Sequence, residues 1–246
     1  MTYRFFLRVV VGALALTLAA PSCNSGTGGR LVPIELRLVG DPTATRFTTA
    51  LGFEIALDEA ELVVGPLYAF APADEPIARR NHAALSIAHA HGGLDPLDGR
   101  KVRAELLDRV LVDALSNEPI PFETLAEEGA IDELRVGLEA EPSRLDGHLA
   151  RVVGTATRDS VTHAFEAFVD VGASPNERRV LVPFVADLTE GTVVELRLDP
   201  RAWLDGVAFD RLGACESPCD FPDGSQAATA AALGVRSVRA YAPRLD

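Results

Sequence analysis

The chain lacks the local motifs that mark many enzymes. Its 246 residues contain no Gly-x-Ser-x-Gly elbow, no His-Glu-x-x-His pair, no phosphate-binding loop and no dinucleotide-binding glycine pattern. It also lacks an excess of positive charge, since 23 lysines and arginines face 36 acids and give a net charge of −13. Nucleic-acid phosphates require a basic surface, so the composition argues against a nucleic-acid partner.

Long apolar runs are scarce, and the most apolar one lies at the amino terminus. Arg4 and Arg8 precede an uncharged run of 12 residues from Val9 to Ala20. This run is shorter than the roughly 20 residues that span a bilayer, and no later stretch is long enough to do so. A positive start, a short apolar core and a small-residue boundary predict a secretory signal peptide over residues 1–22. Its removal would lower the net charge from −13 to −15.

The predicted cleavage site has a further feature. Residues 20–23, Ala-Pro-Ser-Cys, resemble the lipobox of bacterial lipoproteins, in which the cysteine receives a lipid and becomes the new terminus. We therefore expect Cys23 to be lipidated and residues 23–30 to form a polar tether between the anchor and the domain. Asn24 stands where an aspartate often signals inner-membrane retention, so the outer membrane is favoured. The alternative is an ordinary cleaved signal with an incidental cysteine nearby.

Only three cysteines occur in the chain. If Cys23 bears a lipid, Cys215 and Cys219 remain in the sequence CESPC, in a chain expected to reach an oxidising compartment. We predict a structural disulfide between them. The alternatives are a redox pair or half of a zinc site, but the sequence has neither the usual two-residue spacing nor a second cysteine pair.

What the chain does contain is a series of period-two patterns. Val32, Ile34, Leu36 and Leu38 alternate with other residues, as in half-buried antiparallel strands. The same pattern or a β-rich composition marks further segments, which are residues 53–57, 61–70, 134–138, 148–157, 163–171, 179–185 and 194–198. These predict a mainly β single domain over residues 31–246, an antiparallel sandwich or barrel-like fold with one or two short helices, with the strands over 148–198 in a meander or Greek key.

Two short helices are predicted after good capping signals. Asp199 and Pro200 precede RAWLD, and Ser225 precedes an alanine-rich segment that ends at Gly234. Residues 101–115 fit either a helix or buried strands. The segment from about 71 to 100 is long, rich in proline and glycine, and holds three of the five histidines, so any site should be sought there.

His89 and His91 are the main candidates for metal binding. In an extended segment their side chains share one face and could bind copper or zinc, with His82 as a third ligand and Asp95 or Asp98 as alternatives. Solvated histidines on a surface loop explain the same pattern.

Several motifs resemble a poorly characterised group of bacterial β-rich lipoproteins. They are the Ala-His-Ala-His loop at 88–91, the acidic stretch at 95–115, GTATRD at 154–159 and LDPRAWLD at 198–205. In that group the loop continues with a proline, a glycine and a third histidine, whereas this chain has Gly92, Gly93 and Leu94. A more distant similarity, through Trp203 and the histidines, is to methanobactin-associated periplasmic copper-binding proteins.

The sequence thus predicts a lipid-anchored envelope protein that is a non-enzymatic binding or structural module for an unknown partner. The first alternative is a copper- or zinc-binding lipoprotein that uses the histidine loop. The second is a hydrolase without a recognisable motif, which would need a cleft where carboxylates converge. Glu139 and Glu141 are expected on a solvated strand face, and Trp203 in the core.

Overall fold

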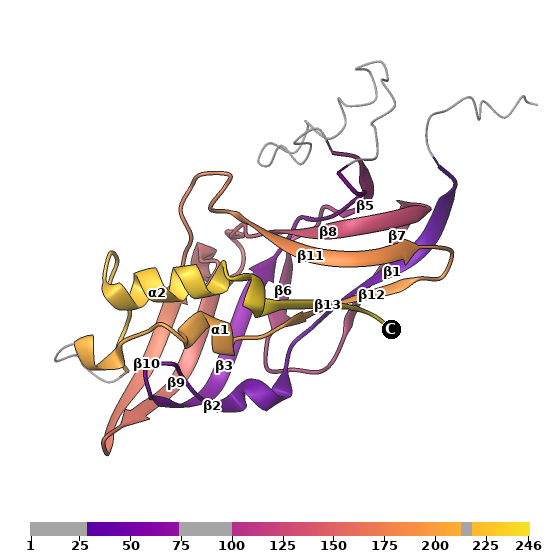
Figure 1. Cartoon of the computed structure of the whole chain (residues 1–246). Coiled ribbons are helices and arrows are strands. Elements are labelled where there is room, and N and C mark those ends of the chain that lie inside the picture. The colour runs from indigo at the N-terminus through magenta and orange to yellow at the C-terminus, as the bar shows by residue number, and fades with distance from the viewer. Residues whose placement is uncertain (1–28, 74–99, 213–217) are drawn as a thin grey trace, which may run out of the picture.

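The computed structural model describes residues 29–73, 100–212 and 218–246. Thirteen strands dominate this part of the chain, and two α-helices lie late in it (Figure 1). The strands are β1 Leu31–Val39, β2 Arg46–Thr48, β3 Glu54–Val64, β4 Leu67–Phe70, β5 Val102–Leu106, β6 Val110–Asp113, β7 Ile120–Glu127, β8 Gly129–Gly137, β9 Ala150–Arg158, β10 Val161–Val169, β11 Arg179–Leu188, β12 Val193–Leu198 and β13 Tyr241–Leu245. The helices are α1 Arg201–Leu204 and α2 Gln226–Val235.

Two four-stranded sheets form a sandwich. One has the order β13-β12-β1-β7 and the other β11-β8-β4-β5. Leu36, Leu38 and Leu196 of the first sheet meet Leu67 and Leu134 of the second around a small cavity of about 20 Å³. Because alternate side chains along these strands are apolar, each sheet presents one apolar face to the other, and the predicted sandwich is confirmed.

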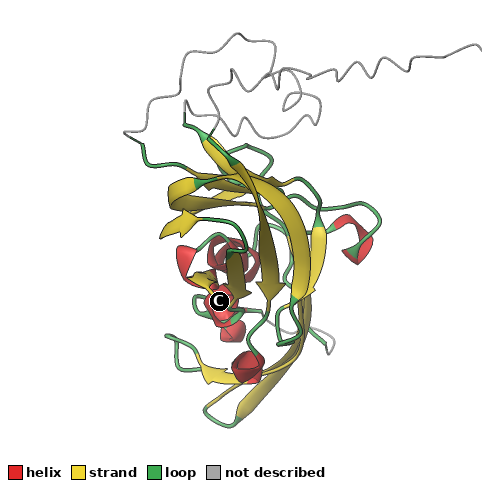
Figure 2. Cartoon of the chain, turned by 90° about the vertical axis from the view of Figure 1, so that its right-hand side faces the viewer, coloured by secondary structure: helices red, strands yellow, loops and turns green. Residues whose placement is uncertain are grey.

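A third sheet extends from the sandwich and supports the helices. It has the order β10-β9-β3-β2, and β6 pairs with the second half of β3. The chain leaves it at Gly65, whose φ of +131° suits glycine, and enters the sandwich as β4. Figures 1 and 2 show α1 and α2 on one side of this curved sheet. The sandwich and the helix-covered sheet share one hydrophobic core.

An aromatic cluster fixes the helical layer to the third sheet. Phe209, in a 3₁₀ turn over Phe209–Arg211, lies with its ring centroid 5.3 Å from Phe53, 5.0 Å from Phe165 and 5.9 Å from Phe221. All four phenylalanines are buried, as is Trp203 of α1, which confirms the predicted core position of the tryptophan. Such ring pairs add to the stabilisation from apolar burial.

Most predicted elements are confirmed, but their pairing differs from the expected meander or Greek key. β9 and β10 form a hairpin closed by Asp159 and Ser160, whose φ values are +52° and +64°. β11, however, pairs with β8, and β12 pairs with β1 in parallel. The expected run of neighbouring strands over 148–198 is therefore wrong, because the later two strands cross to the two sheets of the sandwich.

The ambiguous segment at 101–115 is strand rather than helix, since it forms β5 and β6 on either side of a turn. β2, β7 and β13 are strands that the sequence pattern did not reveal. Both predicted helices are present. Asp199 Oδ1 accepts from Arg201 N at 3.0 Å, and Ser225 Oγ accepts from Ala228 N at 3.1 Å.

The expected position of Glu139 on a solvated strand face is also wrong. This residue is only 8% exposed, and its carboxylate accepts hydrogen bonds from the Arg109 guanidinium. The ion pair explains how a carboxylate can be buried at this position.

Candidate functional site

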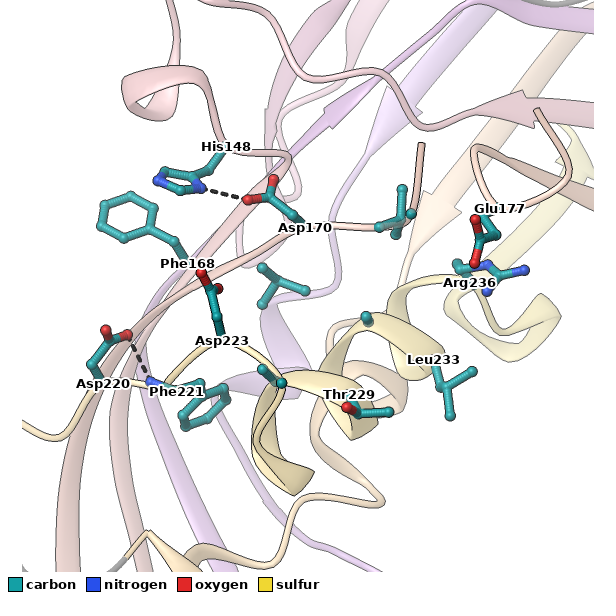
Figure 3. A pocket seen from close by; sticks show the side chains of 16 residues that line it. His148, Phe168, Asp170, Glu177, Asp220, Phe221, Asp223, Thr229, Leu233 and Arg236 are labelled. Atoms are coloured by element: carbon teal, nitrogen blue, oxygen red, sulfur yellow. Dashed lines mark hydrogen bonds and ion pairs between the residues drawn. The ribbon is translucent and has the colours of Figure 1, made fainter. Parts of the chain in front are cut away.

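A cleft with a volume of about 590 Å³ lies between α2 and the end of β10. Its walls come from three stretches of the chain, which are His148, residues 168–177 and residues 220–236 (Figure 3). The volume lies within the range of small-molecule sites, about 300–1,000 Å³.

Helix α2 forms one wall of the cleft. Its helical period places Ala227, Ala231 and Val235 in the core, while Thr229 and Leu233 line the cleft. Ala228 and Ala232 also line it, and their short side chains leave the space beside the helix open. The alanine-rich composition therefore supplies both a stable helix and room for a ligand.

His148 and Asp170 form a pair at the mouth of the cleft. Asp170 Oδ2 lies 2.6 Å from His148 Nδ1, and Asp170 Oδ1 accepts from Leu149 N at 3.0 Å. The His148 ring stacks on Phe168 with centroids 4.6 Å apart. These contacts hold the imidazole and the carboxylate in fixed positions beside an aromatic surface.

Glu177 and Arg236 lie together at another part of the cleft (Figure 3). Hydrogen bonds from the Ser174 side chain and backbone, assisted by the positive charge of Arg236, lower the pKa of Glu177 below its ordinary value. Glu177 is therefore ionised at neutral pH. A general acid of a glycosidase needs a raised pKa, so Glu177 does not fit that role.

The segment after Cys219 forms the opposite end of the cleft. Cys219 exchanges backbone hydrogen bonds with Ala164 and Glu166, which fixes this segment along β10. Asp220 accepts from Phe221 N at 2.7 Å, and Phe221 is anchored in the aromatic cluster. Asp223 lines the same end. The cleft thus holds four carboxylates against one guanidinium, a balance that attracts positive charge.

Most of the residues singled out from the sequence for metal binding or modification are not among the described residues. His82, His89 and His91 fall outside the described residues, as do Cys23 and Cys215. Cys219 is described and buried. Within residues 29–73, 100–212 and 218–246, no group of three or more histidines, cysteines and acids is placed to hold a metal ion. The cleft itself was not predicted, because its acids come from segments far apart in the sequence.

Fold and cleft together define a β-sandwich protein with an added helix-covered sheet and an acidic, helix-lined cleft. No family model matches the chain, and no curated protein sequence matches it. A solved structure, MbnP from Methylosinus trichosporium, is similar over 88% of this chain and 98% of that chain, with 12% identity and a TM-score of 0.38. With this identity and TM-score, the similarity supports no conclusion about the function of this chain.

Proposed function

We propose that the chain is a non-enzymatic, lipid-anchored binding protein of the cell envelope, and that its ligand site is the cleft beside α2. The observation that supports this most is the cleft itself, whose volume of about 590 Å³ suits a small molecule or a peptide side chain. Hydrogen bonds hold Asp170, Glu177 and Asp220, and the core holds Phe221, as in preformed sites.

The position of the cleft agrees with an anchor at the amino terminus. Gly29 N donates to Glu127 Oε1 at 2.6 Å, so the chain is attached to β7 at the end of the predicted tether. Figure 1 shows the start of β1 and α2 at opposite ends of the molecule. A protein held through Cys23 would therefore present the cleft away from the membrane. Within the described residues, no helix has both the length and the apolar character needed to span a bilayer.

Binding is tested on the full chain, exported and purified in detergent. Amide signals of Gly172, Gly224 and Thr229 are followed by NMR while amines, carboxylates and sugars are added in turn. We expect at least one class to shift these signals, and Ala232→Trp, which fills the cleft, to abolish the shift. A library in which no compound moves the cleft amides would overturn the proposal.

The anchor is tested by mass spectrometry of the same material. The amino-terminal peptide of the native protein should begin at Cys23 and bear acyl chains, whereas Cys23→Ser should remain unacylated and leave the membrane fraction. An unmodified Cys23 in the mature native protein would refute the anchor while leaving the ligand site intact.

The metal-binding alternative makes a separate prediction. If the histidine loop binds copper or zinc, titration of the wild type should show binding that is lost in His89→Ala/His91→Ala. Unchanged stoichiometry in this variant would eliminate the histidine loop as the site.

A further inference from the structure

The distribution of charge in the cleft narrows the class of ligand. Asp220 and Asp223 lie at one end with Asp170 near them along the wall, while Glu177 and Arg236 lie at the other end (Figure 3). The guanidinium offsets the carboxylate of Glu177 but is remote from the aspartates. One end therefore holds Asp220 and Asp223, with Asp170 beside them in contact with His148, and the other end is close to neutral.

The aspartates at the acidic end retain capacity to accept hydrogen bonds. Neither Asp220 nor Asp223 forms an ion pair with any described residue. Asp220 accepts one backbone hydrogen bond, from Phe221. A carboxylate offers about four lone-pair sites. Elsewhere in the described chain, many carboxylates are paired with arginine, as Asp41 is with Arg201 and Glu139 with Arg109.

The lining also contains apolar side chains. Phe168 and Phe221 stand beside the aspartates, and Leu233 of α2 lies toward Arg236. Aromatic rings attract ammonium groups as well as methylene chains, and they provide no hydrogen-bonding groups for a hydroxyl. An anionic ligand would meet four carboxylates and only one guanidinium.

We infer, resting on the proposed function of this same cleft, that the ligand is an aliphatic amine. Its ammonium group binds among Asp170, Asp220 and Asp223, and its carbon chain lies along α2 toward Leu233. Salt bridges at such a partly exposed site are individually weak, so several carboxylates act together to select the cation.

Three probes with the same six-carbon chain test the charge requirement: n-hexylamine, hexanol and hexanoate. We expect hexylamine to shift the amide signals of Gly224 and Thr229, with binding weakened by added salt, and the other two probes to have no effect. Binding of hexanol or hexanoate as strong as that of hexylamine would overturn the inference and leave the binding function standing. Binding of sugars alone in the cleft would likewise overturn the inference and leave the binding function standing.

Charge-removing variants locate the ammonium site. Asp220→Asn/Asp223→Asn should weaken hexylamine binding about tenfold, while retaining the hydrogen-bond acceptor at position 220. The control, Asp159→Asn/Asp187→Asn, removes the same charge at exposed positions outside the cleft and should bind as the wild type does. Thr229→Arg adds a cation to an exposed cleft position and should abolish binding. Equal weakening in the control and the cleft variant would refute a specific site.

Discussion

Gly234 of α2 packs directly on the backbone of Trp203 in α1. A Cβ atom at position 234 would lie 2.6 Å from Trp203 Cα, closer than real contacts allow. Glycine to alanine normally favours a helix by about 1 kcal/mol, but here the two helices would have to separate. We predict that Gly234→Ala lowers the free energy of unfolding by about 1–3 kcal/mol, measured by urea denaturation.

Gly206 provides the matched control for this prediction. A Cβ there would meet Ala230 Cβ at 3.7 Å, which is an ordinary contact. Gly206→Ala should therefore leave the free energy of unfolding within about 0.5 kcal/mol of the wild type. Equal destabilisation by both substitutions would show that close packing of α1 on α2 is not the cause.

Asp41 should contribute stability that depends on pH. Burial would raise its pKa, but hydrogen bonds from the Thr43 side chain and backbone, together with the charge of Arg201, outweigh burial and lower the pKa below its ordinary value. A depressed native pKa means that the stabilisation is present above the unfolded-state pKa, near 3.8, and is lost as the pH falls through the native pKa.

Asp41→Asn tests this sign, because asparagine can still accept from Thr43 N but cannot pair as an anion with Arg201. We expect it to cost about 1–2 kcal/mol at neutral pH and progressively less below about pH 4, in thermal unfolding followed by circular dichroism. A cost that stays constant over the acidic range would contradict an ionic contribution.

The predicted disulfide between Cys215 and Cys219 has a direct chemical test. Cys219 is buried and its backbone is fixed to β10, so a bridge would hold the segment that bears Asp220. Non-reducing digestion should yield a peptide that contains both cysteines and lacks the two thiol hydrogens. Cys215→Ser should lower the free energy of unfolding by about 2 kcal/mol. This is the entropic stabilisation expected from a disulfide that closes a loop this small. Alkylation of both thiols in the unfolded, unreduced protein would disprove the bridge.

Period-two patterns and capping residues were sufficient to predict the mainly β class and both helices, because each is a local property of the sequence. The pairing of strands, in contrast, is not a local property of the sequence. The parallel contact of β1 with β12 joins Glu35 to Val193, and neither strand's pattern identifies its partner. β7 was missed although Ile120, Phe122 and Thr124 alternate with other residues. Its pattern is weak because much of this strand is only half-buried.

The candidate cleft was less predictable than the fold. The sequence indicated α2 and its cap at Ser225, but not that its exposed face would meet Asp170 and Asp220. With 36 acids in the chain, sequence alone gives no reason to prefer these carboxylates. Glu139 illustrates the same limit, since alternation predicted exposure and only its partner Arg109, from the distant β5–β6 turn, explains its burial.

The Arg109–Glu139 pair should be asymmetric in energy. The Glu139 side chain is 9% exposed, whereas that of Arg109 is 39% exposed. Arg109→Ala leaves a buried carboxylate without this partner, so we expect a loss of about 2–3 kcal/mol in the free energy of unfolding at neutral pH. Glu139→Gln leaves a guanidinium that can turn to water, and it should cost about 1 kcal/mol. Equal costs for the two substitutions would mean that burial of Glu139 does not control the energy of the pair.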